Sequence, residues 1–391
     1  MIVYADNAAT TAVSPAAREA MLKCLDNDYG NPSSLHLMGR QASKALEAAR
    51  ASIAESIGAK SEEIYFTSGG TEADNWAISI AAENGARKNK RHIISTVIEH
   101  HAVLHMLDRL SKQGYEITLL PIHSDGIVRP EELSEAIRED TALVTVMYAN
   151  NEIGTVQPIS RIGEICRERG VLFHTDAVQA AGRIAIDVGK LQIDMLSMTA
   201  HKFHGPKGAG ILYCRKGIAL TSFIEGGAQE RGRRAGTENV PAAAGMAAAL
   251  EESCRNMSES NTRVEAMRDR LIDALCGIEY SRLNGHKENR LPGIANFCFE
   301  GIEGEALLLM LDAAGICASS GSAFTSGSLD PSHVLLALGL PHEVAHGSLR
   351  LSLSDYNTQE EVEYIIRTLP PIIARLRDMS PVWEKIKKGE N

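Results

Sequence analysis

The 391-residue sequence contains no apolar run that approaches the roughly 20 residues needed to cross a bilayer. Its opening, MIVYADNAAT, lacks both the basic start and the cleavable apolar stretch of a secretory signal. It also lacks any CxxC pair. The seven cysteines are an odd number and widely scattered, which fits reduced thiols better than a disulfide framework or a zinc site. We therefore expect a cytoplasmic protein with no membrane span and no metal.

The sequence also has fewer basic than acidic residues. The chain has 40 lysines and arginines against 50 aspartates and glutamates, a net charge of -10. Because nucleic-acid binding relies on a concentrated basic surface, the sequence predicts no nucleic-acid partner. There is no internal repeat and no low-complexity tract apart from an alanine-rich stretch at Pro241 to Leu250, so we expect order nearly throughout.

Strand and helix patterns alternate in the first two thirds of the chain. A chain of this length usually needs more than one hydrophobic core. The alternation predicts an α/β fold whose sheet is mostly parallel and covered on both faces. After about residue 255 the pattern changes to that of a smaller α+β lobe. We expect a large domain at residues 16–255 and a small domain made of residues 1–15 and 256–391. The predicted strands of the large domain are IYFT, HIIST, ITLL, ALVTVMY, VLFHTDA, DMLSMT and GAGILYC.

Polar residues follow several of these strands, at the edge where open parallel sheets bind ligands. After the first strand, the turn from Thr67 to Glu72 contains two glycines and opens a helix, and such a terminus binds phosphate through unpaired amides. Taken alone, this turn also fits an ordinary helix cap. His100 and Asn151 follow two further strands, and each alone fits a capped surface residue or a turn.

Two later strands end in charged residues, an aspartate and a lysine, whose position predicts a specific chemistry. Asp176 follows a β-branched run in HTDAVQ, and a buried carboxylate needs a cationic partner, for which a protonated pyridine nitrogen is one candidate. Lys202 lies at a strand end in AHKFHGPKGAG, where desolvation would lower its pKa and leave an amine able to form a Schiff base. The alternative is a structural lysine that reaches the rim. Together with the glycine turn, Asn151 and Gln179, these residues form the set that a pyridoxal-phosphate site requires.

The motifs that carry this set resemble the cysteine desulfurase (NifS/IscS-like) family of class V aminotransferase-type enzymes. The resemblance extends over essentially the whole chain. It implies a fold type I pyridoxal-phosphate enzyme, a homodimer, that converts L-cysteine to L-alanine and supplies sulfur to an iron–sulfur scaffold or another acceptor protein. The motifs are YADNAATT, YGNPSSLH, TSGGTEADN, NNEIGTVQPI, HTDAVQ, AHKFHGPKGAG, RAGTENV and SSGSAFTSGSLDPSHV.

The resemblance also implies roles for individual residues. Lys202 would carry the cofactor, Asp176 would meet the pyridinium nitrogen, and His100 would stack over the ring as an acid and base. Arg350 would bind the substrate carboxylate, a task that its planar fork suits, with Asn31 close to the substrate. The ring oxygen would be met by Asn151 and Gln179, and the phosphate by Gly70, Thr71, Thr199, His201 and, from the partner subunit, Thr237.

One position departs from the family pattern. In the family, the mobile loop at 319–327 carries a cysteine whose thiolate takes the sulfur of the substrate, but here that position is Phe324, which has no nucleophilic atom. Cys317 is seven residues earlier. Because extended chain rises about 3.3 Å per residue, its thiol could lie up to ~23 Å from position 324. We interpret Cys317 as a core residue of low reactivity. The sequence predicts that persulfide formation is compromised.

Three functions are compatible with these observations. The first is a cysteine desulfurase-family enzyme that keeps its fold, cofactor and substrate recognition. The second is a pyridoxal-phosphate lyase that acts on cysteine or selenocysteine by elimination, and the third is a non-catalytic, cofactor-binding protein of sulfur trafficking. Phe324 is either a natural change in a paralogue or an introduced substitution. Fold resemblance does not choose among the three functions, because function resides in the site.

Overall fold

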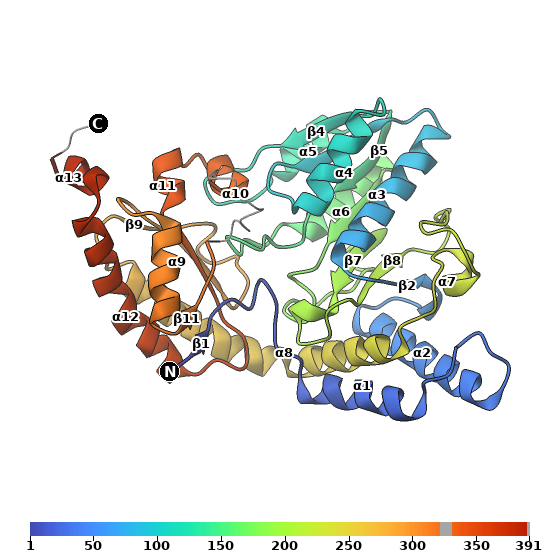
Figure 1. The fold of residues 1–391 in the computed structure, drawn as a ribbon. Helices are drawn as coiled ribbons and strands as arrows, with labels where there is room; N and C mark the ends of the chain where they lie inside the picture. The colour runs from blue at the N-terminus through green and yellow to red at the C-terminus, as the bar shows by residue number, and fades with distance from the viewer. Residues whose placement is uncertain (321–330, 389–391) are drawn as a thin grey trace.

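The computed structural model describes residues 1–320 and 331–388. Its centre is a seven-stranded sheet in the order β2-β8-β7-β6-β5-β3-β4 (Figure 1). Strand β8 runs antiparallel to both of its neighbours, and the other pairs are parallel. The predicted α/β class and the mostly parallel sheet are therefore confirmed. The strands are β2 (Ile64–Thr67), β3 (His92–Thr96), β4 (Glu116–Leu120), β5 (Thr141–Thr145), β6 (Leu172–Asp176), β7 (Met195–Thr199) and β8 (Gly210–Cys214).

Helices bury both faces of this sheet, because neighbouring residues along a strand point to opposite sides. Ile93 packs with Trp76 and other residues of α3, whereas the next residue, Ile94, belongs to the core on the other face. Continuous apolar runs are what a strand covered on two faces requires. The helices of this part are α1 (Pro15–Asn27), α2 (Leu37–Ser56), α3 (Gly70–Ala86), α4 (His101–Ser111), α5 (Pro130–Ala136), α6 (Ile159–Arg169) and α7 (Gln229–Gly232), with the 3-10 turns η1 (Ser61–Glu63) and η2 (Ala200–Lys202).

A second core surrounds two smaller sheets. One has the antiparallel order β12-β10-β9, and in the other β1 pairs in parallel with β11. Val3 and Ala5 lie in this core, so the first residues of the chain pack with the last third of the sequence. The elements are β1 (Val3–Tyr4), β9 (Ser281–Leu283), β10 (Ile294–Phe299), β11 (Ile316–Cys317), β12 (Ser348–Ser352), α9 (Gly304–Ala313), α10 (His333–Ala337), α11 (His342–His346), α12 (Gln359–Asp378) and α13 (Pro381–Lys388).

One long helix connects the two cores. Helix α8 (Val240–Leu275) is 36 residues long and lies along the bottom of the view in Figure 1. Its alanine-rich first part packs in the core of the large sheet, and its charged last part packs in the second core. The change in composition near residue 255 therefore marks a change of packing partner inside a continuous helix. The division into domains at 255 stays a prediction.

Membrane-spanning helices were not expected from the sequence. Within residues 1–320 and 331–388, every helix is too short or too polar to cross a bilayer.

Candidate active site

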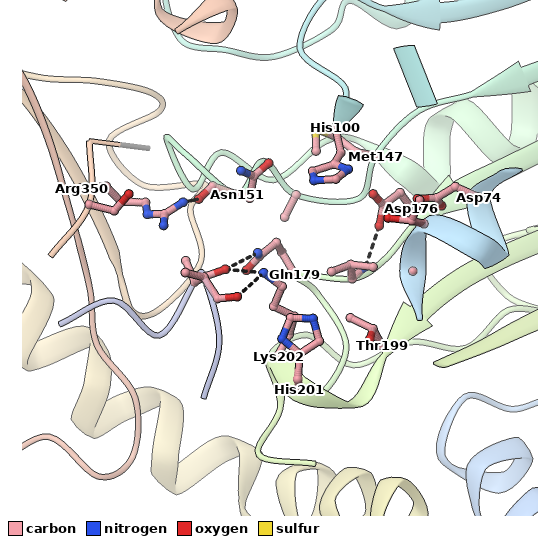
Figure 2. A pocket seen from close by; sticks show the side chains of 17 residues that line it. Asp74, His100, Met147, Asn151, Asp176, Gln179, Thr199, His201, Lys202 and Arg350 are labelled. Carbon is pink, nitrogen blue, oxygen red and sulfur yellow. Dashed lines mark hydrogen bonds between the residues drawn. The ribbon is translucent and has the colours of Figure 1, made fainter. Parts of the chain in front are cut away.

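A cavity of about 350 Å³ lies beyond the carboxyl ends of the parallel strands. This volume lies within the roughly 300–1,000 Å³ typical of small-molecule sites. The large sheet supplies most of its wall, while the N-terminal segment and β12 close one side (Figure 2). The structure brings together in this cavity the following predicted residues: Gly70, Thr71, His100, Asn151, Asp176, Gln179, Thr199, His201, Lys202 and Arg350.

One end of the cavity is the N-terminus of α3. Gly69 is the N-cap and has no side chain to cap the helix. The first amides of a helix have no partner within it, and the helix dipole makes this end positive. Glu72 in the same turn is paired with Arg234 at 2.8 Å and accepts the Ser68 amide at 2.8 Å. Burial alone would raise the pKa of Glu72, but these hydrogen bonds hold it below its ordinary value. The turn can therefore bind a phosphate despite its acidic residue.

Lys202 lies in the turn that follows β7. Its Nζ donates to the backbone oxygens of Ala8 and Ala9, at 2.6 and 2.8 Å. Burial, followed by the positive charge of Arg350, lowers the pKa of Lys202 to about 8, against the opposing effect of Asp176. Figure 2 shows the amine inside the cavity, so the structure favours a nucleophilic lysine over one that reaches the rim.

Asp176 ends β6 on another wall of the cavity. Asp176 is 6% exposed, and its carboxylate accepts the Val178 amide at 2.9 Å. Burial raises the pKa of Asp176 to about 6, although the Val178 hydrogen bond and the charge of Lys202 act in the opposite direction. A buried carboxylate of this kind is stabilised by a cation placed against it.

Asp74 is a cavity residue that sequence reasoning missed. It is 1% exposed and lies in α3, four residues after Gly70. Residues four apart share a face of a helix. The available signal was therefore a carboxylate one turn beyond the glycine turn, on a helix expected to cover the sheet.

Two histidines of the cavity are held neutral. His100 is the N-cap of α4, and its Nδ1 accepts the Ala102 amide at 3.1 Å, which places the proton of the neutral ring on Nε2. Burial and the charge of Lys202 lower the pKa of His100 to about 4. The same two causes lower the pKa of His201 to about 4, and its Nδ1 lies 3.2 Å from Thr10 Oγ1. His100 is therefore a neutral hydrogen-bond donor at Nε2 near neutral pH.

Arg350 lies at the opposite end of the cavity from Asp176 (Figure 2). It is 4% exposed, donates to the Asn151 carbonyl at 2.9 Å and forms an ion pair with Asp6 at 2.9 Å. Its Nε is buried without a hydrogen-bond partner among the residues described. Asp6 was not foreseen, and the only signal was an acidic residue inside the YADNAATT motif.

Other predicted positions do not line this cavity. Asn31 is exposed, and its side chain accepts the Ser33 amide at 2.9 Å. Thr237 is exposed and lines a separate cavity of about 220 Å³. Phe324 lies outside the described residues. Cys317 is half-buried, which differs from the predicted core position because β11 is a two-residue strand of a two-stranded sheet.

The donor set of the main cavity fits pyridoxal phosphate. The uncapped helix end suits a phosphate, and the amine of Lys202 suits an aldehyde. The buried Asp176 suits a protonated ring nitrogen. Gln179, which donates to the Ala8 carbonyl at 3.0 Å, and Asn151 lie between these groups and Arg350 in Figure 2.

Comparisons with known proteins agree with this geometry. The aminotransferase class-V family profile matches residues 3–365. A curated relative from Methanosarcina thermophila, named cysteine desulfurase IscS, is 53% identical over 384 residues, which cover 98% of this chain and 95% of the relative. A solved structure titled NifS-like protein is 40% identical with a TM-score of 0.91, covering 96% of this chain and all of the other. A structure titled SspA in complex with cysteine is 35% identical with a TM-score of 0.80, covering 91% of this chain and all of the other.

These matches extend over nearly the full length of the chain and of the relatives, at identities well above those that indicate the fold alone. The chain belongs to the cysteine desulfurase (NifS/IscS-like) family of pyridoxal-phosphate-dependent, class-V aminotransferase-type proteins.

Proposed function

We propose that this chain is a pyridoxal-phosphate-dependent enzyme of the cysteine desulfurase type, which converts L-cysteine to L-alanine and delivers the sulfur to an acceptor. One observation carries the proposal: a single cavity holds a lysine of lowered pKa together with a buried carboxylate and a buried arginine. These supply an amine for the aldehyde of the cofactor, a carboxylate for its ring nitrogen and a cation for the carboxylate of the amino acid. The relatives named cysteine desulfurase, and the relative solved with cysteine, support L-cysteine as the substrate.

The proposed roles of the residues follow from their protonation states. When bound, the cofactor supplies an electron sink for bond breaking at the substrate α-carbon. Lys202 attaches the cofactor and, when neutral, can accept a proton at Nζ. His100 is neutral at physiological pH and can donate a hydrogen bond from Nε2, and the family resemblance supports a role for it as an acid and base. Arg350 orients the substrate through its carboxylate.

The remaining contacts are proposals that the family resemblance supports. Asn151 and Gln179 would contact the ring oxygen. Asn31 would lie close to the substrate when the subunits of a homodimer come together. We further propose a cytoplasmic location and an iron–sulfur scaffold, or another sulfur acceptor protein, as partner. The phosphate would be held by Gly70, Thr71, Thr199 and His201, with Thr237 reaching in from the other copy of the chain.

Phe324 changes the expected outcome of the reaction. It occupies the position of the sulfur-accepting cysteine, and its side chain cannot attack sulfur. We propose that substrate binding is kept and that sulfur transfer to the chain is compromised. This residue favours a second candidate, a lyase that releases sulfide from cysteine or selenide from selenocysteine by elimination. It also leaves open a non-catalytic, cofactor-binding role in sulfur trafficking.

Product analysis separates these functions. Purified holoenzyme is mixed with L-cysteine and an added thiol as sulfur acceptor, while the cofactor absorbance is recorded. Alanine with sulfide or persulfide supports the desulfurase, whereas pyruvate with ammonia supports the lyase and contradicts it. A cofactor spectrum that responds to no amino acid would instead support the non-catalytic role.

Arg350→Lys is expected to weaken L-cysteine binding roughly 10- to 100-fold, because lysine cannot form the two-pronged bridge to a carboxylate. The dissociation constant is read from the change in cofactor absorbance on titration with L-cysteine. Arg268→Lys is a matched control, since Arg268 is also buried but pairs with Asp269 on α8. Equal affinities for L-cysteine in wild type and Arg350→Lys would contradict the proposal that Arg350 binds the substrate carboxylate.

The rate of cofactor attachment to apoenzyme is expected to rise about tenfold per pH unit and to level off above about pH 8, because only a neutral amine adds to an aldehyde and the pKa of Lys202 is lowered to about 8. Stopped-flow absorbance measures this rate. Nα-acetyl-lysine, which keeps a free ε-amine, is the solution control. Its rate of reaction with the cofactor should keep rising toward ~pH 10.4. In Arg350→Gln the plateau should move to higher pH, because a positive charge that lowers the pKa of Lys202 is removed. A wild-type rate that climbs in parallel with the control would contradict the assigned pKa.

A further inference from the structure

Asp74 is a buried acid in the wall of the main cavity to which the proposed reaction gives no role. It is 1% exposed, and its Oδ1 has no hydrogen-bond partner within residues 1–320 and 331–388. An ionised carboxylate in this position would be costly, because burial removes water and the hydrogen bond from Ser197, which lowers the pKa, does not outweigh that loss. Burial and the neighbouring charge of Asp176 raise the pKa of Asp74 well above its ordinary value.

The groups around Asp74 supply no compensating cation. His174 Nε2 is 3.7 Å from Asp74 Oδ1, but its two ring nitrogens contact Ser197 Oγ at 3.0 Å and Thr145 Oγ1 at 2.8 Å. The imidazole is fully buried, which lowers the pKa of His174 to about 3 and keeps it neutral. It therefore cannot balance a negative charge on Asp74.

A third carboxyl group belongs to the same cluster. Glu99 is fully buried and accepts hydrogen bonds from Thr96 Oγ1 at 2.7 Å and the Met147 amide at 3.0 Å, and its pKa is raised by burial to about 8. Asp176 interacts electrostatically with both Glu99 and Asp74. Neighbouring buried carboxyl groups cannot all ionise.

Asp176 is the member best placed to carry the negative charge. It has the Val178 amide as a donor and the charge of Lys202 acting on it, and it would face the ring nitrogen of the cofactor. Figure 2 shows Asp74 and Asp176 at the same end of the cavity. Since α3 carries both the phosphate turn and Asp74, a single helix would position both ends of the cofactor.

We propose that Asp74 is a positioning residue that stays protonated and offers its proton to Asp176, so that Asp176 keeps the negative charge that holds the ring nitrogen of the cofactor protonated. The inference rests on the proposed role of Asp176 and is independent of the fate of the sulfur. A neutral O–H donor stabilises a carboxylate without adding a second charge beside it. Removal of the donor leaves Asp176 a stronger base, which withdraws the proton from the ring.

Two variants of nearly the same shape test the proposal. Asp74→Asn keeps a neutral donor, whereas Asp74→Leu removes the donor and leaves little room for a replacing water. The probe is pyridoxal phosphate labelled with ¹⁵N at the ring nitrogen, bound to the holoenzyme and observed by solid-state NMR. Its affinity for each apoenzyme is also measured. We expect Asp74→Leu to move the ¹⁵N shift toward that of an unprotonated ring and to weaken binding about tenfold, while Asp74→Asn stays close to wild type.

Asp194→Asn is the control, since Asp194 is a buried acid outside the cavity, at the opposite end of β7, where it binds Arg215 and the Phe173 amide. Thermal unfolding checks that each variant folds, and Asp74→Ala replaces Asp74→Leu if the latter does not. An unchanged ring shift in the donor-less variant overturns the proposal, as do equal losses in both variants. Tighter cofactor binding in both would also overturn it, because Asp74 would then be charged. These readouts need no turnover, so a chain that forms no alanine would refute the desulfurase function and leave this test intact.

Discussion

Lys202→Ala is expected to abolish covalent attachment of the cofactor and to lower turnover of L-cysteine by at least ~10⁴-fold, because among residues 1–320 and 331–388 no other lysine lines the cavity to take over its proposed roles as nucleophile and proton acceptor. In the cavity, the Nζ of Lys202 is held by the carbonyls of Ala8 and Ala9, and its pKa is lowered to about 8. The visible absorbance of the protein after incubation with pyridoxal phosphate and dialysis measures attachment. Borohydride reduction followed by peptide mapping identifies the modified residue in wild type.

Lys207→Ala is the control for this experiment. Lys207 lies five residues further along the chain and is exposed, so its loss should change neither attachment nor turnover. Retained absorbance in Lys202→Ala, with the label on another lysine, would disprove the assignment of the cofactor site. Phosphate binding at the α3 terminus should persist in this variant, since its amides are unaltered, and the cofactor should still associate reversibly.

Phe324→Cys is expected to raise alanine formation from L-cysteine by at least about a hundredfold, because it would supply a thiolate at the position proposed for the sulfur acceptor. The main cavity already contains most of the residues proposed for cofactor and substrate. Alanine is quantified over time, and mass spectrometry of the protein detects an added sulfur atom. That mass should be present in Phe324→Cys after cysteine is added and missing from the wild-type chain.

Two further variants separate the thiol from other effects of the substitution. Phe324→Ser also removes the bulky ring but supplies no thiolate, so it should not gain the sulfur adduct. Phe324→Cys combined with Cys317→Ala should behave like Phe324→Cys alone, since Cys317 lies in β11 and is not the proposed acceptor. If alanine formation does not increase in Phe324→Cys, the change at 324 is not what limits sulfur transfer.

The fold was predictable from the sequence wherever local pattern and global packing agree. The strands of the large sheet stand out because both of their faces are buried, and β5 (TALVT), buried at each of its five positions, is typical of such a strand. The ligand-binding edge followed from the parallel order, which is why Gly70, Asp176 and Lys202 could be placed in one site.

Features that depend on long-range packing were not predictable in the same way. The continuity of α8 through residue 255 has no strong local signal, because a helix can change its packing partner without a break in its backbone. The pairing of Asp6 with Arg350 joins residues that are remote in sequence. Asp74 was overlooked because a single acid in a helical pattern usually faces solvent, and only the three-dimensional structure shows that it is buried.

The pairing of the first strand with β11 determines when the active site can assemble. Residues 3 and 4 find their partners at 316 and 317, and the backbone of Asp6 pairs with Ser352. During synthesis, residues 3 to 6 therefore cannot reach their final places until residues 316 to 352 have been made. The carbonyls of Ala8 and Ala9, which hold Lys202, and the carboxylate of Asp6, which pairs with Arg350, belong to the same N-terminal segment. Cofactor capture is consequently a late step of folding.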